Sequence, residues 1–272
     1  MTVPEVETFG KGSSQLQERY LEVLFSPVEF AALTQLDLSA TTCVVFDVLR
    51  ATSTMAVALS NGAKAILPVA SISEALTIRS QRPDVLLVGE RDGVRIPLDL
   101  TGGIAFCLGN SPREFTSEIV SGKTIVMTTT NGTRAFRAAV HASRVLVASF
   151  LNLAATAERL IKDAPAKILL VCAGTKDEPA YEDALCAGAL CELLWSRWCT
   201  QGCSDSALMA RKLFCQERHD LLAAISQSRN GQRLLSLPEL RNDVQYCVQP
   251  NLLDFVLERD KAGEVVLADL HI

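Results

Sequence analysis

Acidic and basic side chains follow the predicted strands at places where they could hold a phosphorylated anion and a divalent cation. Four carboxylates stand out, Asp47, Glu90, Glu182 and Asp183, and Arg50 follows the first of them by three residues. Hard cations such as Mg²⁺ take oxygen ligands, often one or two carboxylates together with phosphate oxygens of a substrate. A guanidinium beside hydroxyl groups suits a phosphate or a sulfonate. These residue types indicate metal-assisted phosphate chemistry.

The same residues also have structural explanations. Glu182 and Asp183 open a predicted helix, where negative charge is stabilised by the helix dipole. Arg50 could instead form a salt bridge with Asp47 or Glu90 that closes the edge of a sheet. The sequence alone leaves both interpretations open.

Two short loops could hold the anion itself. Asn131, Gly132 and Thr133 lie between a predicted strand and a predicted helix. Glycine there lets the backbone approach a ligand closely, and free N–H groups at a helix start favour an anion. The alternative is an ordinary helix cap. Asn110 and Ser111 allow the same two interpretations.

An alternation of strand and helix patterns must position these groups. Short apolar runs predict strands at 42–47, 65–68, 84–88, 124–127, 144–148 and 167–172, with helices at 51–60, 73–81, 134–141 and 153–162 between them. Unbroken apolar runs suit strands buried on both faces of a parallel sheet. In open α/β sheets, ligands bind beyond the carboxyl ends of the strands, which is where the charged residues fall.

The pattern therefore predicts an α/β protein, a layered α/β/α arrangement with a mostly parallel sheet and a helical C-terminal third. That third contains predicted helical segments at 180–198, 206–226 and 231–240, followed by a short strand at 264–267. An amphipathic segment around residues 16–24 precedes the first strand. We expect a single α/β domain over residues 1–272, or two α/β lobes with a seam near 93–123.

Composition excludes several classes of protein. The 272 residues contain 26 Lys and Arg against 31 Asp and Glu, a net charge of −5. The sequence pI near 5.3 argues against nucleic-acid binding. No apolar run reaches the length of about 18 residues that a membrane span needs, and the first ten residues do not resemble a secretory signal. We expect a soluble, cytoplasmic protein.

The nine cysteines are interpreted as structural thiols in a reducing compartment. Cys43, Cys172, Cys186, Cys191 and Cys247 lie in hydrophobic stretches, where cysteine behaves as a small buried hydrophobe. Cys199 and Cys203 are the one closely spaced pair of cysteines. A zinc site would also need a second cysteine pair, or histidines at matching spacing.

Five ordered motifs together resemble the family of magnesium-dependent 2-phosphosulfolactate phosphatases. They are Asp47-Val-Leu-Arg-Ala-Thr52, Gly89-Glu-Arg91, Leu108-Gly-Asn-Ser-Pro112, Thr129-Thr-Asn-Gly-Thr133, and Cys172-Ala-Gly174 with Glu182-Asp183. The resemblance covers roughly residues 40–195. It implies hydrolysis of 2-phospho-3-sulfolactate to 3-sulfolactate and phosphate, a step on the way to coenzyme M.

The residues and the resemblance together predict an active site. Asp47, Arg50 and Glu90 are expected to be catalytic, and Glu90, Glu182 and Asp183 to hold Mg²⁺. The residues expected to contact the substrate are Arg50, Thr52, Arg91, Asn110, Ser111, Thr129, Asn131, Gly132 and Thr133. The expected partner is a small anionic phosphorylated substrate, with neither nucleic acid nor membrane, and a homodimer is a further option. The alternatives are a phosphatase of another phosphorylated metabolite and a non-catalytic binder of a small anion.

One position departs from the family pattern. Members commonly read Gly-Phe-Asp-Leu-Gly-Asn-Ser-Pro, whereas here Ala105-Phe106-Cys107-Leu108 precedes Gly109. A thiol is a poor ligand for a hard cation. If the acid of the family is a metal ligand, Cys107→Asp should tighten Mg²⁺ binding. If a longer loop at 97–109 has moved the residue away, the substitution should change nothing.

Overall fold

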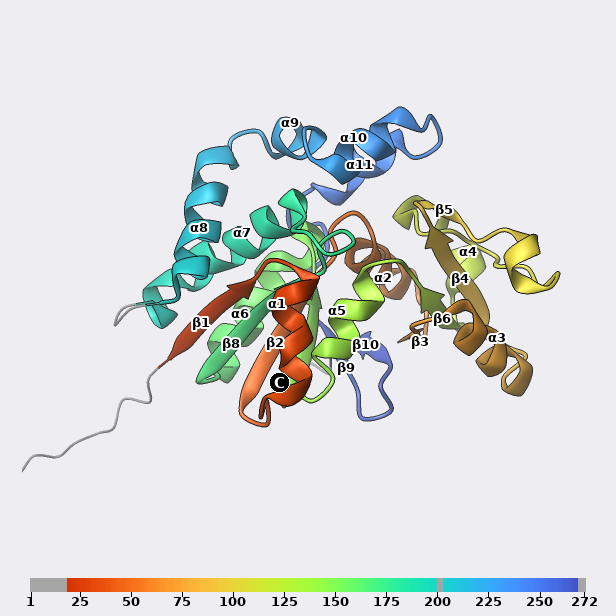
Figure 1. The fold of residues 1–272 in the computed structure, drawn as a ribbon, viewed down its shortest axis with the longest axis horizontal. Helices are drawn as coiled ribbons and strands as arrows, with labels where there is room; N and C mark the ends of the chain where they lie inside the picture. Colours follow the sequence, from red (N-terminus) through yellow and green to blue (C-terminus); the bar gives the residue numbers. More distant parts are fainter. Residues whose placement is uncertain (1–18, 200–202, 269–272) are drawn as a thin grey trace, which may run out of the picture.

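The computed structural model of the chain describes residues 19–199 and 203–268. Its strands are β1 (Tyr20–Leu24), β2 (Thr41–Phe46), β3 (Ala65–Pro68), β4 (Leu86–Arg91), β5 (Val94–Arg95), β6 (Thr124–Thr128), β7 (Arg144–Ala148), β8 (Lys167–Cys172), β9 (Leu257–Arg259) and β10 (Val265–Leu267). Its α-helices are α1 (Pro27–Ala31), α2 (Ala51–Ser60), α3 (Ile72–Gln81), α4 (Ser117–Val120), α5 (Gly132–Ala138), α6 (Leu153–Asp163), α7 (Tyr181–Trp198), α8 (Asp205–Glu217), α9 (Leu221–Ser226), α10 (Arg229–Ser236) and α11 (Arg241–Cys247). The strands form one sheet in the order β1-β8-β2-β7-β9-β10-β3-β6-β4-β5, with helices packed around it (Figure 1). The predicted α/β class with a mostly parallel sheet is confirmed.

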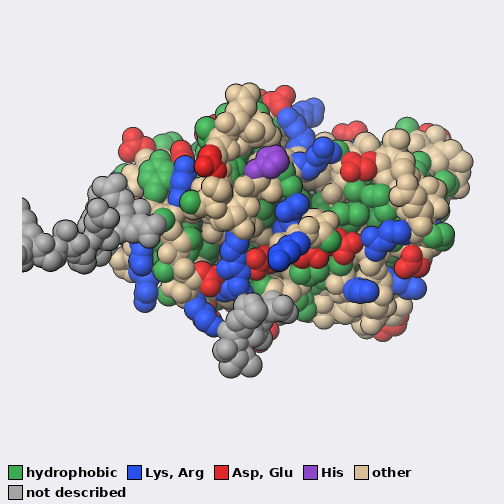
Figure 2. All heavy atoms as spheres, turned by 90° about the horizontal axis from the view of Figure 1, so that it is seen from below, with side chains coloured by type: hydrophobic (Ala, Val, Ile, Leu, Met, Phe, Trp, Pro, Cys, Tyr) green, Lys and Arg blue, Asp and Glu red, His purple; other side chains and the backbone are tan. Residues whose placement is uncertain are grey.

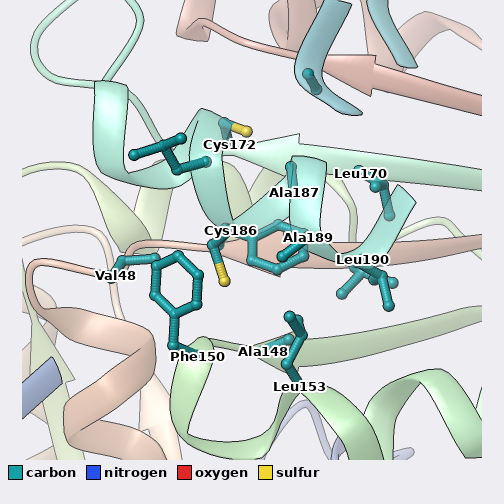
Figure 3. Packing of buried hydrophobic residues seen from close by; sticks show 14 of the residues in the cluster. Val48, Ala148, Phe150, Leu153, Leu170, Cys172, Cys186, Ala187, Ala189 and Leu190 are labelled. Atoms are coloured by element: carbon teal, nitrogen blue, oxygen red, sulfur yellow. The ribbon is translucent and has the colours of Figure 1, made fainter. Parts of the chain in front are cut away.

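The first parallel block of the sheet contains β1, β8, β2 and β7. Alternate side chains of a strand point to opposite faces, and both faces of β2, β7 and β8 are buried. Val44 and Phe46 of β2 join the core beneath α6 and α7, whereas Cys43 and Val45 join the core beneath α2 and α5. Figure 3 shows the first of these cores, where the Cys186 side chain of α7 points toward the ring of Phe150. Burial on both faces explains the unbroken apolar runs in the sequence.

The second parallel block contains β3, β6 and β4. Met127 of β6 faces the core that α2 and α5 cover. Its neighbour Val126 faces a smaller core that contains Ala75 of α3. This block carries the Gly89–Arg91 motif at the end of β4 and leads from β6 into the loop before α5. Both blocks therefore end in predicted site residues.

The hairpin β9–β10 joins the two blocks, and all three of its pairings are antiparallel. In a flat sheet, three antiparallel pairings would leave the blocks running in opposite directions. Neighbouring strands rotate by about 20–25° on average, and six such steps separate β2 from β4. The accumulated rotation offsets the reversal that the antiparallel pairings cause. As a result, β1 and β4 both point toward the side where α10 and α11 lie (Figure 1).

The C-terminal third is helical, as predicted, but its segments divide differently. The predicted helix at 206–226 is two helices, because Asp220 caps α9 by accepting a hydrogen bond from the Ala223 N–H. The segment predicted at 231–240 is α10, which begins earlier, after the Ser228 cap, and α11 follows it. The amphipathic segment near the start contains the edge strand β1, and its residues before Arg19 lie outside the described part. The number of domains stays a prediction.

The opposite end of the molecule carries charges of both signs. Figure 2 shows the face that points away from α10 and α11, where Lys and Arg side chains are interspersed with Asp and Glu. Mixed charge of this kind is typical of an ordinary solvated surface. The chemistry therefore has to be sought at the other end, beneath the C-terminal helices.

Candidate active site

A polar cleft lies where the ends of β2 and β4 meet the loops after β6 and β8. The residues that line it are Asp47, Leu49, Arg50, Glu90, Asp92, Gly93, Asn110, Thr130, Asn131, Thr175, Lys176, Asn230, Arg233 and Leu234. An adjoining cavity of about 430 Å³ shares Thr175 and Asn230 with the cleft and includes Glu182. The strand-end residues predicted from both halves of the sheet, Asp47, Arg50, Glu90 and Asn131, do meet here.

Asp47 follows β2 directly and is almost fully buried. Its Oδ1 accepts a hydrogen bond from the Ala51 N–H at 3.1 Å, so the carboxylate caps the start of α2. Its Oδ2 lies against Gly132, where a Cβ atom would be 2.6 Å away. Burial raises the pKa of Asp47 to about 7, the Ala51 bond opposes this rise, and the charges of Glu90 and Glu182 add to it. Gly132 is required because the carboxylate occupies the space a side chain would fill.

Asp183 and Glu182, adjacent at the start of α7, have different surroundings. Asp183 accepts backbone N–H bonds at both oxygens, from Val48 at 2.8 Å and from Gly174 at 3.2 Å. It therefore ties the loop after β2 to the loop after β8, and burial raises its pKa. Glu182 accepts one bond, from the Asn230 amide to Oε1 at 2.6 Å. Its other oxygen, Oε2, is buried without any hydrogen-bond partner in the structure.

Glu90 holds two loops of the cleft in place. Its Oε1 accepts from the Thr130 N–H at 2.7 Å and its Oε2 from the Gly93 N–H at 2.6 Å. Both carboxylate oxygens are thus bound to backbone groups of the loops they position. Across the described residues, no group of three or more His, Cys, Asp or Glu side chains is placed to hold a metal ion.

Arg50 forms the main charged contact of the cleft, with a residue the sequence did not indicate. Its guanidinium donates to Asp243 of α11 at 2.7 Å and to the Gly93 carbonyl at 2.6 Å. Asp243 also accepts from the Ser111 hydroxyl at 2.7 Å, and the half-exposed Arg113 approaches it at 3.4 Å. The ion pair that Arg50 makes is with Asp243, and no salt bridge joins it to Asp47 or Glu90 in the described structure.

The remaining predicted substrate residues divide into two groups. Asn110 lines the cleft, and its amide oxygen is buried without a partner. Thr52, Arg91 and Thr133 hydrogen-bond to neighbouring strand ends, as when Arg91 donates to the Thr128 hydroxyl at 3.1 Å. Thr129 is buried beside them with an unpartnered hydroxyl oxygen. This second group supports the walls of the cleft rather than lining it.

Cys107 lies outside the cleft. Its side chain is exposed, and its backbone N–H bonds to the Leu87 carbonyl alongside β4. Arg95 donates to its carbonyl at 3.2 Å. The structure thus agrees with the second expectation for this position, in which the 97–109 segment keeps the residue away from the predicted ligands.

Sequence reasoning missed the contribution of the C-terminal helices. Asn230 and Arg233 of α10 and Asp243 of α11 all reach the cleft or its residues. Lys176, in the loop before α7, lines it as well. A polar residue on an amphipathic helix gives no signal of which distant loop it will contact. One local signal was present but was not used: Ser228 is a typical cap residue, and α10 begins directly after it rather than at residue 231.

The cysteines agree with the expected thiol role. All nine are free, and the five predicted to be buried are buried. Burial raises the pKa of Cys43 and of Cys247 to about 12, so both stay protonated. In the part of the chain that the structure describes, no helix has the length and apolarity to cross a membrane.

An α/β sheet with a cleft of acids and cations at its strand ends is typical of a protein that binds a small ligand there. A family model described as 2-phosphosulpholactate phosphatase matches residues 30–262. A probable 2-phosphosulfolactate phosphatase of Symbiobacterium thermophilum is 38% identical over 235 residues, which cover 86% of this chain and 97% of that protein. Those named alike in Caldicellulosiruptor saccharolyticus and Thermotoga maritima are 39% and 40% identical, each covering 79% of this chain and 87% of the relative. The chain belongs to the 2-phosphosulfolactate phosphatase family, whose class is phosphoric monoester hydrolase.

Proposed function

We propose that this protein hydrolyses 2-phospho-3-sulfolactate to 3-sulfolactate and inorganic phosphate, and that it requires Mg²⁺. The names of relatives at 34–40% identity support the substrate. The observation that carries the proposal is the buried, unpartnered Oε2 of Glu182, whose charge is close enough to contribute to the raised pKa of Asp47. An unpaired buried carboxylate oxygen is costly unless a cation satisfies it.

The residues fit a Mg²⁺ ion held by few protein ligands. Of the predicted ligands, Glu90 and Asp183 each accept two backbone hydrogen bonds, whereas Glu182 has a free oxygen. Asp47 accepts the Ala51 N–H at Oδ1, and within the described structure its Oδ2 accepts no hydrogen bond. Mg²⁺ usually binds through one or two carboxylates and takes its other ligands from water and substrate phosphate. Asp47 and Glu182 would hold it, and when bound it polarises the phosphoryl group and acidifies a bound water.

The other cleft residues bind and orient the substrate. Arg50 carries the positive charge nearest to Asp47 along the chain, and its ion pair with Asp243 fixes the guanidinium in one orientation for the phosphoryl oxygens. Asn110 lines the cleft, and the N–H groups of its side-chain amide can donate to the substrate's oxygens. Glu90 acts as a positioning residue, because it fixes the backbone at Thr130 and Gly93. Fixed dipoles and charges of this kind stabilise the developing charge of phosphoryl transfer.

The proposal also includes the fate of the product and a cytoplasmic location. 3-Sulfolactate released by this reaction would enter the formation of coenzyme M, as the family resemblance implies. Nine free thiols suit a reducing compartment, which supports a cytoplasmic location. A homodimer stays a prediction.

Phosphate release tests the proposal. The purified protein is incubated with 2-phospho-3-sulfolactate, 2-phospholactate or phosphoglycolate, each with Mg²⁺ and with excess chelator. We expect release from the first substrate with Mg²⁺ and none after chelation. Release from another substrate alone would assign a different phosphatase, and binding without release would assign an anion-binding protein. Full activity in chelator would refute the metal requirement.

A pair of variants tests the role of Glu182. Glu182→Gln removes the charge of the unpartnered oxygen, and we expect Mg²⁺ to bind at least about tenfold more weakly. Glu118→Gln, an exposed glutamate on α4, is the matched control and should behave as the wild type. Magnesium titration by calorimetry measures both. Equal affinities in the two variants would exclude Glu182 as a ligand.

A further inference from the structure

Lys176 is held at the mouth of the cleft by a tight turn. The turn spans residues 175–178 and is closed by two backbone hydrogen bonds between Thr175 and Glu178, at 2.8 and 3.2 Å. Lys176 has φ of 60°, in the left-handed region that non-glycine residues rarely adopt. An uncommon backbone conformation of this kind persists only where surrounding contacts stabilise it.

Those contacts come from two sides. On the α5 side, Asn131 Oδ1 accepts from the Lys176 N–H at 3.2 Å, and Arg134 donates to the Lys176 carbonyl at 3.0 Å. On the α10 side, Arg229 donates to the Glu178 carboxylate at 2.8 Å. The backbone that carries the Lys176 side chain is thus fixed relative to the cleft, although the residue itself is exposed.

Among the described residues, nothing neutralises the positive charge of Lys176. Three cations line the cleft, Arg50, Arg233 and Lys176. Arg50 is paired with Asp243, and Arg233 donates to the Asp92 carbonyl and approaches the Asp92 carboxylate at 3.8 Å. Within the described residues, the Lys176 ammonium takes part in no ion pair. An unpaired cation that lines a binding cleft is available to an anionic ligand.

We propose that Lys176 binds the sulfonate end of the substrate and so selects a sulfonated phosphate ester over an unsulfonated one. This inference rests on the proposed function, in which Arg50 and the carboxylates take the phosphoryl end. A sulfonate stays ionised at all physiological pH values and offers three acceptor oxygens. The compact ammonium of lysine, with three donors on a flexible stem, suits such a group.

Kinetics with two substrates test the inference. 2-Phospho-3-sulfolactate and 2-phospholactate differ only in the sulfonate. For Lys176→Gln we expect KM for the sulfonated substrate to rise about tenfold or more, which matches one charge-assisted hydrogen bond. We expect kcat to change little and the constants for 2-phospholactate to stay as in the wild type. Lys176→Arg should recover most of the loss, and Lys123→Gln, an exposed lysine before β6, is the control.

Binding of 3-sulfolactate and of lactate, measured by calorimetry, separates the two proposals. If the wild type hydrolyses no sulfonated substrate but binds 3-sulfolactate through Lys176, the proposed function fails and this inference stands. If Lys176→Gln weakens both substrates equally, the residue acts on the common part of the molecule and the inference is wrong. Unchanged KM for the sulfonated substrate would also overturn it.

Discussion

Arg50 and Asp243, 193 residues apart in the sequence, form a buried ion pair with 2.7 Å between Nη1 and Oδ2. Their side chains are 3% and 0% exposed. Arg50 follows β2, an internal strand of the sheet, and Asp243 lies on α11 in the C-terminal third. The pair therefore makes the orientation of a cleft residue depend on the C-terminal helices.

Removing the acid of this pair should destabilise the protein. Asp243→Ala leaves the Arg50 guanidinium buried without its counter-ion, for which we expect a loss of about 3–5 kcal/mol in the free energy of unfolding. Arg113→Ala is the control, since Arg113 reaches the same carboxylate from an exposed position and should cost under about 1 kcal/mol. Urea unfolding measures both. Similar losses in the two variants would contradict the assignment of the buried pair.

Gly132 should not tolerate even a methyl group. A Cβ there would lie 2.6 Å from Asp47 Oδ2 and 2.8 Å from the Ala51 Cβ. We expect Gly132→Ala to lower both activity and the free energy of unfolding, the latter by about 1–3 kcal/mol. Gly109→Ala is the matched control, because its nearest neighbours would be at ordinary contact distances from 3.4 Å. The melting temperatures of both variants provide the test. If both variants melted at the wild-type temperature, the close contact between position 132 and Asp47 would be contradicted.

Asp47 should make the metal-free protein less stable at higher pH. Burial raises its pKa from 3.8 to about 7, so the folded protein keeps a proton that the unfolded chain has released. The stability due to this proton is complete below about pH 4 and is lost as pH rises through 7. Asp47→Asn, which retains an oxygen for the Ala51 N–H, should be more stable than the wild type at pH 8 by on the order of 1–4 kcal/mol.

The pH series supplies the check on this prediction. Melting temperatures are measured in chelator from pH 5 to 8 for the wild type, Asp47→Asn and the exposed Asp84→Asn. The difference between the first two should grow with pH, whereas Asp84→Asn should follow the wild type. A constant difference across the range would show that Asp47 has no raised pKa.

Cys107→Asp should leave magnesium binding unchanged. The side chain is exposed and lies outside the cleft, so a carboxylate there reaches none of the proposed ligands. An exposed substitution of this kind usually alters stability by no more than about 0.5 kcal/mol. Calorimetric titration of both proteins with Mg²⁺ tests this prediction. Tighter binding by the variant would show that position 107 belongs to the metal site.

The sequence predicted the strands that are buried on both faces, because apolar runs such as that of β2 carry their own signal. It also predicted that Asp47, Arg50, Glu90 and Asn131 would meet, because strand ends are where α/β sheets bind ligands. The pairing of β9 with β10 could not be predicted. Both strands are only three residues long, and the strand predicted at 264–267 carried no indication of which strand it would pair with. Short strands have too few alternating positions to reveal a pattern.

The contacts that Asp243, Asn230 and Lys176 make at the cleft could not be predicted either, and the reason is different. Each is a polar residue in a segment whose local pattern is explained by helix or turn formation alone. Their roles come from contacts across 40 or more positions of sequence, such as the one between Asn230 and Glu182, 48 residues apart. Such contacts cannot be inferred from the local spacing of residues, because they form only when distant segments pack together.

The joining hairpin β9–β10 also constrains the order in which the chain can fold during synthesis. A ribosome completes both parallel blocks of the sheet before it makes residues 257–267, which contain the only strands that connect β7 to β3 in the described sheet. Until then, the exposed edges of β7 and β3 have no partner, and unpaired edges of this kind invite association with other chains. Growing chains that stall before residue 257 should therefore depend on chaperones far more than finished ones.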